Sequence, residues 1–557
     1  MSLRRFAVPS LLLVVSLAWL LPARPALAVT KDKFLAALPK KLTKITVHPE
    51  SVELEHRYDY RQLLFTGTLD TGEEVDITRL VEQTQPCGAV EVNGRGLVTP
   101  REDGSGSMTF GLGDQTIEVP VRVTGVAERY HPSYIQDVNP VMSKIGCNAG
   151  TCHGAKDGKN GFKLSLRGYD PLYDIRSLTD DVAGRRFNRA APDQSLMLLK
   201  PAGAVPHEGG VLMSPGEPYY EILRSWIADG VTFDPDDPGV VKIEVLPQGT
   251  TIPLPELSQQ MKVIATFEDG SRRDVTSEAF IEPSDIEVLA IDKTGLVTAL
   301  RRGEAAVLAR YEGAYAATQI YIMGDRTGYA WPGVPAYNYI DKLVYKKQRQ
   351  VKVLPSDVCT DAEFVRRIYL DLTGLPPEPN VVEAFLADER DRRVKRDELV
   401  ESLIGNPDFV DHWTNKWADM LQVNAKVLGV GGARDLRNWI RHAVDANMPY
   451  DKFVYEVITA TGSNRENPPA AYFKTLRDPA ETMENTTQLF LSIRFNCNKC
   501  HDHPFERWTQ DQYYDLAAYF AQVGRRGDPL YKGKTIGGSA VEERQPLVEL
   551  IYDTGKG

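Results

Sequence analysis

Apolar and polar residues alternate in two stretches of the chain, at residues 44–124 and 242–323. The first stretch opens with the residues KITV at 44–47, and the second opens with KIEV at 242–245. Alternation with a period of two places the apolar side chains on one face of a strand. Short strands at intervals of about ten residues, separated by Gly and Asp turns, are typical of β-sandwiches. The pattern therefore predicts one β-sandwich in each stretch.

The two stretches form an internal repeat. They share, in the same order, the segments 72–78 (GEEVDIT) and 270–276 (GSRRDVT), followed by GLVT at 96–99 and at 295–298. Both stretches resemble bacterial immunoglobulin-like domains of the invasin and intimin type. The resemblance implies two Ig-like β-sandwiches, bounded by residues 29–127 and 240–325, which act as spacers.

The remaining parts of the chain have helical periodicity. Residues 128–235 lose the alternation and are expected to form a small α domain. Residues 336–523 are expected to form a larger, mostly α domain, in which Trp413 and Trp417 recur at helical spacing and indicate a core face. Residues 524–557 return to Gly-rich, strand-like sequence, where we expect the start of a further, truncated segment. The predicted fold class is thus multidomain, with separate α and β parts.

The N-terminus has the pattern of a secretory signal peptide. Arg4 and Arg5 precede an apolar run at residues 6–21, and an A-x-A cleavage site follows at residues 26–28. A membrane anchor is the alternative, but the apolar run is short for a span. We therefore expect removal of residues 1–28, and export of the mature chain to the periplasm or the cell surface.

Charge and hydropathy narrow the possible partners. The chain has 65 Lys and Arg against 76 Asp and Glu, a net charge of −11, which argues against a nucleic-acid partner. After the first 28 residues, no apolar run of about 18 residues occurs, so no membrane span is expected in the mature chain. Six cysteines in 557 residues are too few for a disulfide-built scaffold.

The segment CNKCH at residues 497–501 has the spacing of a c-type haem attachment motif. In such a motif, two thiols add to the haem vinyl groups and the adjacent histidine binds the iron. The motif therefore predicts a covalent haem c on Cys497 and Cys500, with His501 as an axial ligand.

A second cluster, CNAGTCH at residues 147–153, has a longer loop between its cysteines. It predicts a haem c on Cys147 and Cys152 with His153 as the proximal ligand. The opposite ligand is expected from His207 or Met213, of which we favour His207 because a Pro/Gly-shaped loop surrounds it. With a helix on each side of this region, residues 128–235 resemble a small cytochrome c.

Other interpretations of the cysteine clusters stay open. A C-x-x-C pair in an exported protein is also compatible with a disulfide or a thiol redox pair. Cys497, Cys500, His501 and His503 also form a possible zinc set, although the adjacent Cys500 and His501 do not easily reach one tetrahedral ion together. Cys87 and Cys359 stand alone and are expected to be packed thiols.

Two longer motifs suggest a family. Residues 364–377 (FVRRIYLDLTGLPP) and 500–508 (CHDHPFERW) resemble the planctomycete cytochrome-c-associated family of domains of unknown function. The region around Cys147 and His207 resembles the cytochrome c-like module that is often fused to it. The resemblance implies an exported, haem-bearing protein, and it implies no substrate.

Together these patterns predict an exported dihaem c-type cytochrome that carries one or two covalent haems and transfers electrons to an unidentified redox partner. An open site at the second haem would make the protein an oxidoreductase. The alternative is a surface adhesion or carbohydrate-associated protein, with an Ig-like scaffold and with structural zinc or disulfides at the cysteine clusters.

Overall fold

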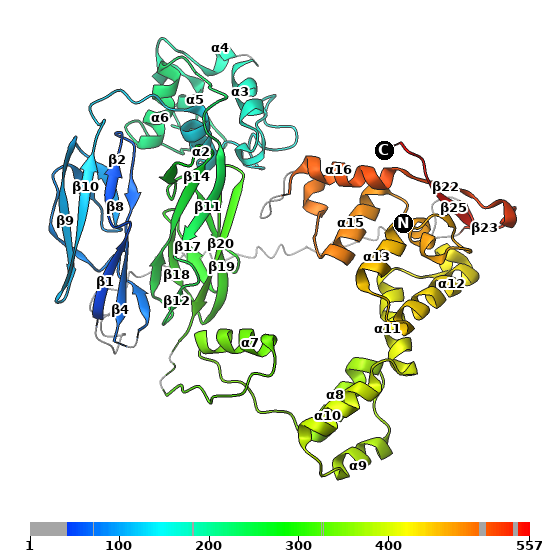
Figure 1. Cartoon of the computed structure of the whole chain (residues 1–557). Coiled ribbons are helices and arrows are strands. Elements are labelled where there is room, and N and C mark those ends of the chain that lie inside the picture. The colour runs from blue at the N-terminus through cyan, green and yellow to red at the C-terminus, as the bar shows by residue number, and fades with distance from the viewer. Residues whose placement is uncertain are drawn as a thin grey trace, which may run out of the picture. The chain divides into compact units, whose positions relative to one another are not determined.

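The computed structural model describes residues 42–70, 72–180, 183–324, 326, 328–500, 508–537 and 544–556. The chain divides into two compact units (Figure 1). The first contains residues up to 334 together with 349–352, and the second contains residues 335–348 and 353 onward. The predicted signal peptide, residues 1–28, lies outside the described residues.

The first β unit of the chain is built from ten short strands in three sheets, ordered β1-β4-β5, β2-β10-β9-β6 and β3-β8-β7. The strands are β1 (Leu42–His48), β2 (Val52–Leu54), β3 (Arg61–Gln62), β4 (Leu64–Leu69), β5 (Glu74–Asp76), β6 (Glu82–Gln85), β7 (Val90–Val92), β8 (Leu97–Pro100), β9 (Gly104–Leu112) and β10 (Gln115–Val123).

The second β unit repeats this topology, with sheets ordered β11-β14-β15, β12-β20-β19-β16 and β13-β18-β17. Its strands are β11 (Val240–Leu246), β12 (Thr251–Ile252), β13 (Ser258–Gln260), β14 (Lys262–Phe267), β15 (Arg272–Asp274), β16 (Phe280–Pro283), β17 (Leu289–Ile291), β18 (Leu296–Ala299), β19 (Gly303–Tyr311) and β20 (Ala314–Ile322). The internal repeat in the sequence is therefore a repeat of structure.

Alternation of side chains explains why these segments form strands. In β10, Val119, Val121 and Val123 are buried while Glu118 and Arg122 are exposed. One face of the strand thus contributes to the apolar core and the other face meets solvent. Burial of each such side chain contributes about 1.5–3 kcal/mol.

A tight turn recurs at the same place in both β units. It ends at Gly96 in the first and at Gly295 in the second, and both glycines have φ of +78°. A Cβ atom added at Gly96 would lie 2.9 Å from the Leu63 carbonyl oxygen. Both the left-handed backbone and the close approach therefore require glycine here.

The two β units exchange a reciprocal pair of hydrogen bonds. The backbone N–H of Gln62 donates to Asp274 Oδ2 over 2.7 Å, and the N–H of Gln260 donates to Asp76 Oδ2, also over 2.7 Å. Gln62 and Gln260 occupy equivalent positions of the repeat, as do the two aspartates. Each unit thus satisfies a strand-end amide of the other, and burial raises the pKa of Asp76.

A buried lysine reinforces one half of this exchange. Lys262 Nζ lies 3.2 Å from Asp274 Oδ2 and donates to the Gln62 carbonyl oxygen over 2.9 Å. The side chains of Lys262 and Asp274 are 1% and 0% exposed. Burial lowers the pKa of Lys262, and the Asp274 carboxylate opposes that effect.

A helical insert lies between the two β units in sequence. Its helices are η1 (Tyr134–Val138), α2 (Asn139–Lys144), η2 (Leu166–Gly168), α3 (Pro171–Thr179), α4 (Ala183–Arg186), η3 (Pro192–Gln194), α5 (Leu196–Leu199) and α6 (Pro218–Ala228). Its core is filled by side chains around Trp226, which is fully buried and lies 5.4 Å from the Tyr134 ring.

Buried polar contacts hold the insert against the second β unit. Arg273 Nη1 donates to Asp137 Oδ1 over 2.8 Å, and the Tyr130 hydroxyl donates to Asp137 Oδ2 over 2.6 Å. Lys144 Nζ donates to the Ala279 carbonyl oxygen over 2.7 Å. Buried and partly buried polar contacts therefore join the insert and both β units.

The second unit is mainly helical. Its helices are α7 (Tyr339–Gln350), α8 (Asp361–Thr373), α9 (Pro379–Ala387), α10 (Arg392–Leu403), α11 (Pro407–Met420), α12 (Ala425–Asp445), α13 (Tyr450–Ile458), η4 (Pro468–Ala470), α14 (Ala471–Thr475), α15 (Pro479–Leu491), η5 (Asn496–Lys499), α16 (Gln510–Ala521) and η6 (Pro529–Tyr531). Its short strands are β21 (Gly462–Ser463), β22 (Val523–Gly527), β23 (Thr535–Ile536), β24 (Gln545–Pro546) and β25 (Glu549–Asp553).

Aromatic packing supports the core of the second unit. The Trp417 and Phe453 rings lie 4.7 Å apart, and the Trp439 and Phe453 rings 5.0 Å apart. The segment from residue 524 was expected to start a further part of the chain. In the structure, β25 pairs with β21 and β22, and Ile551 joins this helical core.

The expected fold class, a multidomain chain with separate α and β parts, is confirmed at this level. None of the helices in the described ranges is both long and apolar enough to span a membrane.

We predict that Asp274→Asn lowers the free energy of unfolding by about 3 kcal/mol, because it leaves the Lys262 ammonium buried without its counter-charge. The double variant Asp274→Asn/Lys262→Met should recover most of the loss, because the unpaired charge is then absent. Urea unfolding of the full chain measures both values.

The matched control is Glu287→Gln, which removes an exposed ion pair with Arg301 and should cost about 0–1 kcal/mol. A loss in Asp274→Asn no larger than in this control would contradict the account.

Candidate functional site

The first cysteine cluster forms a tight turn directly after α2. The His153 N–H donates to the Cys147 carbonyl oxygen over 3.0 Å, and the Cys152 N–H donates to that of Ala149 over 2.9 Å. Cys147 is half-buried and packs against the core of the insert. Burial and the nearby Cys152 raise the pKa of the Cys147 thiol to about 12. The thiol therefore stays protonated at neutral pH and is a poor nucleophile.

The His153 ring is held in one orientation. Its Nδ1 lies 3.0 Å from the Phe162 carbonyl oxygen, and the His153 and Phe162 rings are 4.6 Å apart. A carbonyl oxygen only accepts, so Nδ1 carries the proton and Nε2 is left as an acceptor. Burial lowers the pKa of His153, which favours the neutral ring.

The two candidate opposite ligands lie in different surroundings. His207 is half-exposed, and its Nδ1 lies 3.2 Å from the Gly210 carbonyl oxygen. Met213 is 2% exposed and packs within the core of the insert. The Met213 side chain therefore has a packing role in this structure, while His207 lies close enough for its charge to act on the pKa of His153.

Of the second cysteine pair, Cys497 lies on the short helix η5 and Cys500 directly follows it. Both Cys497 and Cys500 are exposed, and the Asn498 side chain between them is buried and donates to the Trp508 carbonyl oxygen over 2.5 Å. This arrangement points the amide inward and leaves both thiols at the surface. His501 and His503 lie outside the described residues.

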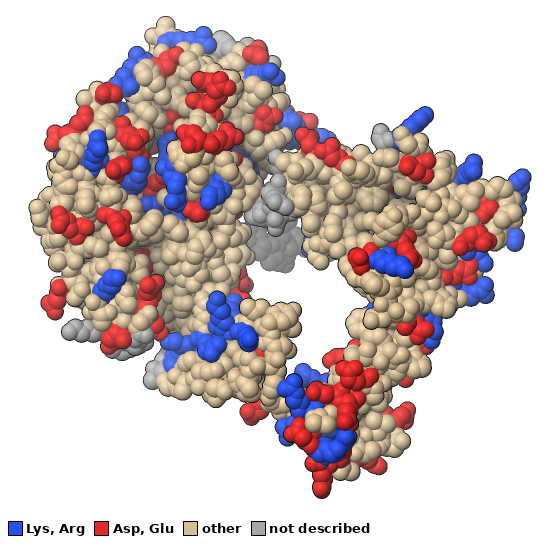
Figure 2. Space-filling view, in the orientation of Figure 1, with Lys and Arg blue, Asp and Glu red and all other residues tan. Residues whose placement is uncertain are grey.

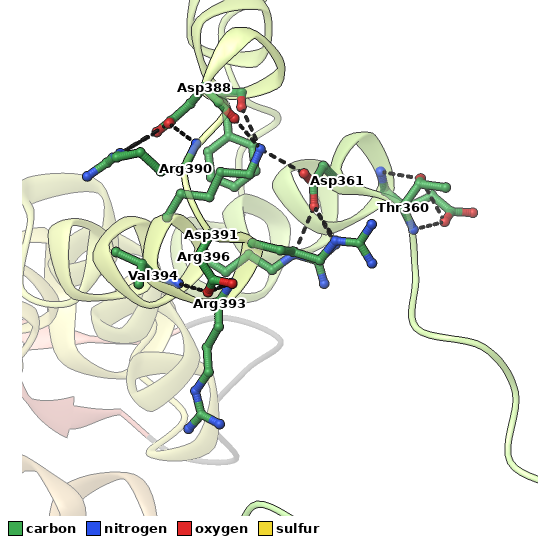
Figure 3. Close-up of polar contacts among 12 residues, drawn as sticks. Thr360, Asp361, Asp388, Arg390, Asp391, Arg393, Val394 and Arg396 are labelled. Carbon is green, nitrogen blue, oxygen red and sulfur yellow. Dashed lines mark hydrogen bonds and ion pairs between the residues drawn. The ribbon is translucent and has the colours of Figure 1, made fainter. Parts of the chain in front are cut away.

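A charged cluster that the sequence analysis missed lies at the N-terminus of α8 (Figure 3). Asp361 accepts from Lys395 Nζ over 2.8 Å and from Arg396 Nη2 over 2.6 Å, and Arg392 Nε lies 3.8 Å away. The hydrogen bond from Lys395 contributes most to lowering the pKa of Asp361 below its ordinary value. One carboxylate thus serves three cations of α10.

The hydrogen-bonding capacity of Lys395 is fully used. Besides Asp361, its ammonium donates to the carbonyl oxygens of Asp388 (2.8 Å) and Phe385 (3.2 Å). Its side chain is 6% exposed. The cluster thereby ties α8, α9 and α10 together, and in Figure 2 acidic and basic side chains crowd around these helices. Its geometry is that of a structural ion network.

One part of the chain matches a known protein family. Residues 339–525 match the PSCyt2 family, described as a protein of unknown function (DUF1549). The expected relation to a family of domains of unknown function is therefore confirmed for this region. No curated protein matches the chain.

Solved structures with similarity to the chain include domains of a surface-layer protein. Domains 5–6 of the S-layer protein SbsC are 13% identical over 52% of this chain and 100% of that one, with a TM-score of 0.22. Domains 4–9 of the same protein are 12% identical over 51% of this chain and 32% of that one, with a TM-score of 0.21.

The prediction of a dihaem cytochrome that transfers electrons is wrong. The family that matches residues 339–525 is described as a protein of unknown function, and the match assigns no electron-transfer role. Within the described ranges, no three His, Cys, Asp or Glu side chains gather so that they could hold a metal ion. The physical reason for the error is that cysteine spacing fixes only a tight turn, which suits a thiol packed against a core, as at Cys147, and thiols at the surface, as at Cys497 and Cys500. The individual ligand assignments stay predictions.

We predict that Asp361→Asn lowers the free energy of unfolding by about 1–3 kcal/mol at neutral pH, because buried donors lose their charged acceptor. The pKa of Asp361 is depressed in the folded state, so its contribution is present above about pH 4 and is lost as the pH falls below that value. Chemical unfolding at pH 7 and pH 3 measures the difference.

Asp397→Asn is the control, because Asp397 forms an exposed pair with Arg393. It should leave stability nearly unchanged at both values of pH. Equal stability of Asp361→Asn and the parent chain at pH 7 would show that the cluster does not hold the three helices.

Proposed function

We propose that this protein is an exported, cell-surface scaffold in which two Ig-like β-sandwiches hold the helical insert in a fixed position. The observation that carries the proposal is the group of buried and partly buried polar contacts that join the three parts of the first unit. It begins at the reciprocal bonds between Asp76, Asp274 and the facing amides. It continues through Arg273 and Asp137 into the insert.

Contacts of this kind favour a fixed arrangement over flexibly linked domains. Separating the β units would expose the Lys262 ammonium and the Asp274 carboxylate, which the folded chain pairs in its interior. It would also break the hydrogen bond that the Tyr60 hydroxyl of the first β unit donates to the Glu278 carboxyl of the second over 2.5 Å. Buried polar groups lose much of their stabilisation when a partner leaves.

A further contact closes the same junction. The Ser277 N–H donates to the Tyr60 hydroxyl over 2.9 Å, and the Tyr219 hydroxyl donates to the Ser277 carbonyl oxygen over 2.9 Å. Ser277 thus connects the first β unit and the insert through its own backbone. At the cell surface, a rigid scaffold of this kind would hold the helical insert at a fixed distance and orientation, so that the insert faces outward.

Surface location is supported by the N-terminal pattern of a signal peptide, with cleavage expected before Val29. The acidic net charge of −11 and the mixture of charged side chains on the visible face suit a protein exposed to solvent (Figure 2).

The experiment labels intact cells with a membrane-impermeant, amine-reactive biotin reagent. We expect labelling of exposed lysines such as Lys242 on intact cells, and an N-terminus at Val29 in the recovered protein. A chain that lacks residues 2–28 is the control and should stay unlabelled until the cells are lysed. Labelling of the parent chain only after lysis, or retention of Met1, would contradict the proposal.

A further inference from the structure

A recess of about 370 Å³ lies where the three parts of the first unit meet. Its wall includes Asn93 and Arg95 from the first β unit, Lys144 from the end of α2, and Ser277 and Lys293 from the second β unit. We call it the junction recess. Its volume falls within the range of about 300–1,000 Å³ that is typical of small-molecule sites.

The charge of the junction recess is opposite to that of the whole protein. Three of its lining residues are cations, Arg95, Lys144 and Lys293, and none of its lining residues is an acid. Asp292 lies beside it and is already paired with Arg95 Nη1 at 2.7 Å. A cationic recess in a chain with a net charge of −11 favours an anionic ligand.

Two of these cations have donors to spare. Lys144 Nζ donates to the carbonyl oxygens of Ala279 (2.7 Å) and Lys293 (3.3 Å), which leaves one of its three N–H groups. The Lys293 ammonium is exposed and forms no hydrogen bond or ion pair with the part of the chain that the structure describes. Burial lowers the pKa of Lys144 to about 8, so a bound anion would stabilise its charged form.

The rest of the wall combines hydroxyl groups with apolar surface. Ser277 and the side-chain amide nitrogen of Asn93 offer polar groups, while Leu97 and Leu212 offer apolar ones. The Thr294 hydroxyl already donates to Asp292 and accepts from Arg95. Tyr219 also lines the recess, and its hydroxyl donates a hydrogen bond to the Ser277 carbonyl oxygen. A ligand that suits this wall has an anionic group, several hydroxyl groups and an apolar ring face.

We propose that the junction recess binds a small sugar acid, with its carboxylate facing Lys144 and Lys293. A sugar acid combines one carboxylate with a hydroxylated ring, which matches a wall that contains lysines together with polar and apolar side chains. An amino acid fits less well, because its ammonium would meet the cations. The proposal goes beyond the scaffold function and does not depend on where the protein is located.

The test is calorimetric titration of the purified full chain with D-glucuronate and D-galacturonate, and with D-glucose as the neutral counterpart. We expect one of the two uronates to bind at a single site, at least about tenfold more tightly than glucose. Lys293→Ala should weaken binding about tenfold, while Lys242→Ala, an exposed lysine of β11, should leave it unchanged.

Lys144→Met is a second variant and should also weaken binding. Because Lys144 contacts two backbone carbonyl groups, the thermal unfolding of the Lys144→Met variant is measured together with its binding. If that variant is unstable, Lys293→Ala decides the test. The proposal would be overturned if neither uronate binds about 1 mM protein when the uronate is present in about 10-fold molar excess. It would also be overturned if Lys293→Ala binds the uronate as tightly as the parent chain does. Binding of sodium sulfate or acetate as tightly as the uronate would overturn it as well, because the recess would then recognise charge without the sugar.

Discussion

The reciprocal bonds between Asp76, Asp274 and the backbone amides of Gln260 and Gln62 are the constraint on which the first unit depends. Each aspartate also supports its own unit, because the N–H of the threonine two residues later donates to its Oδ1. Each of these carboxylates therefore closes a local turn in its own β unit and also joins the two β units. The two aspartate–amide hydrogen bonds are equivalent, but Lys262 places a positive charge beside Asp274. The electrostatic environments of the two aspartates therefore differ.

The junction between the β units also fixes the position of the insert. Because Lys144 reaches the carbonyl oxygens of the second β unit, the end of α2 is fixed beside the turns of both units. The junction recess is a consequence of that placement, since its wall comes from all three parts of the first unit. The cysteine turn at Cys147 follows α2, and its side chain packs against the core of the insert, which raises the pKa of the thiol.

Sequence patterns predicted local features well and long-range contacts poorly. The repeated Gly-Leu-Val-Thr segments marked turns that need Gly96 and Gly295, because backbone φ is a local property. The Gln62–Asp274 bond has no comparable pattern, since a backbone N–H is the same in every residue type except proline. The Asp361 cluster had a usable signal: Arg392, Lys395 and Arg396 fall on one face of a helix by their spacing. The C-x-x-C-H spacing constrains a turn and says nothing of the space around it, so the assignments at Cys497, Cys500 and His501 stay predictions.

Residue-resolved hydrogen exchange at the amides of Gln62 and Gln260 tests the central claim most directly. Both residues end short strands, where an amide without a partner would exchange within seconds. If each amide is held by the aspartate of the other β unit, both should exchange as slowly as the core amide of Val263, which donates to Thr276 Oγ1. Rapid exchange at both positions, with Val263 still protected, would show that the two β units separate in solution and would contradict the account.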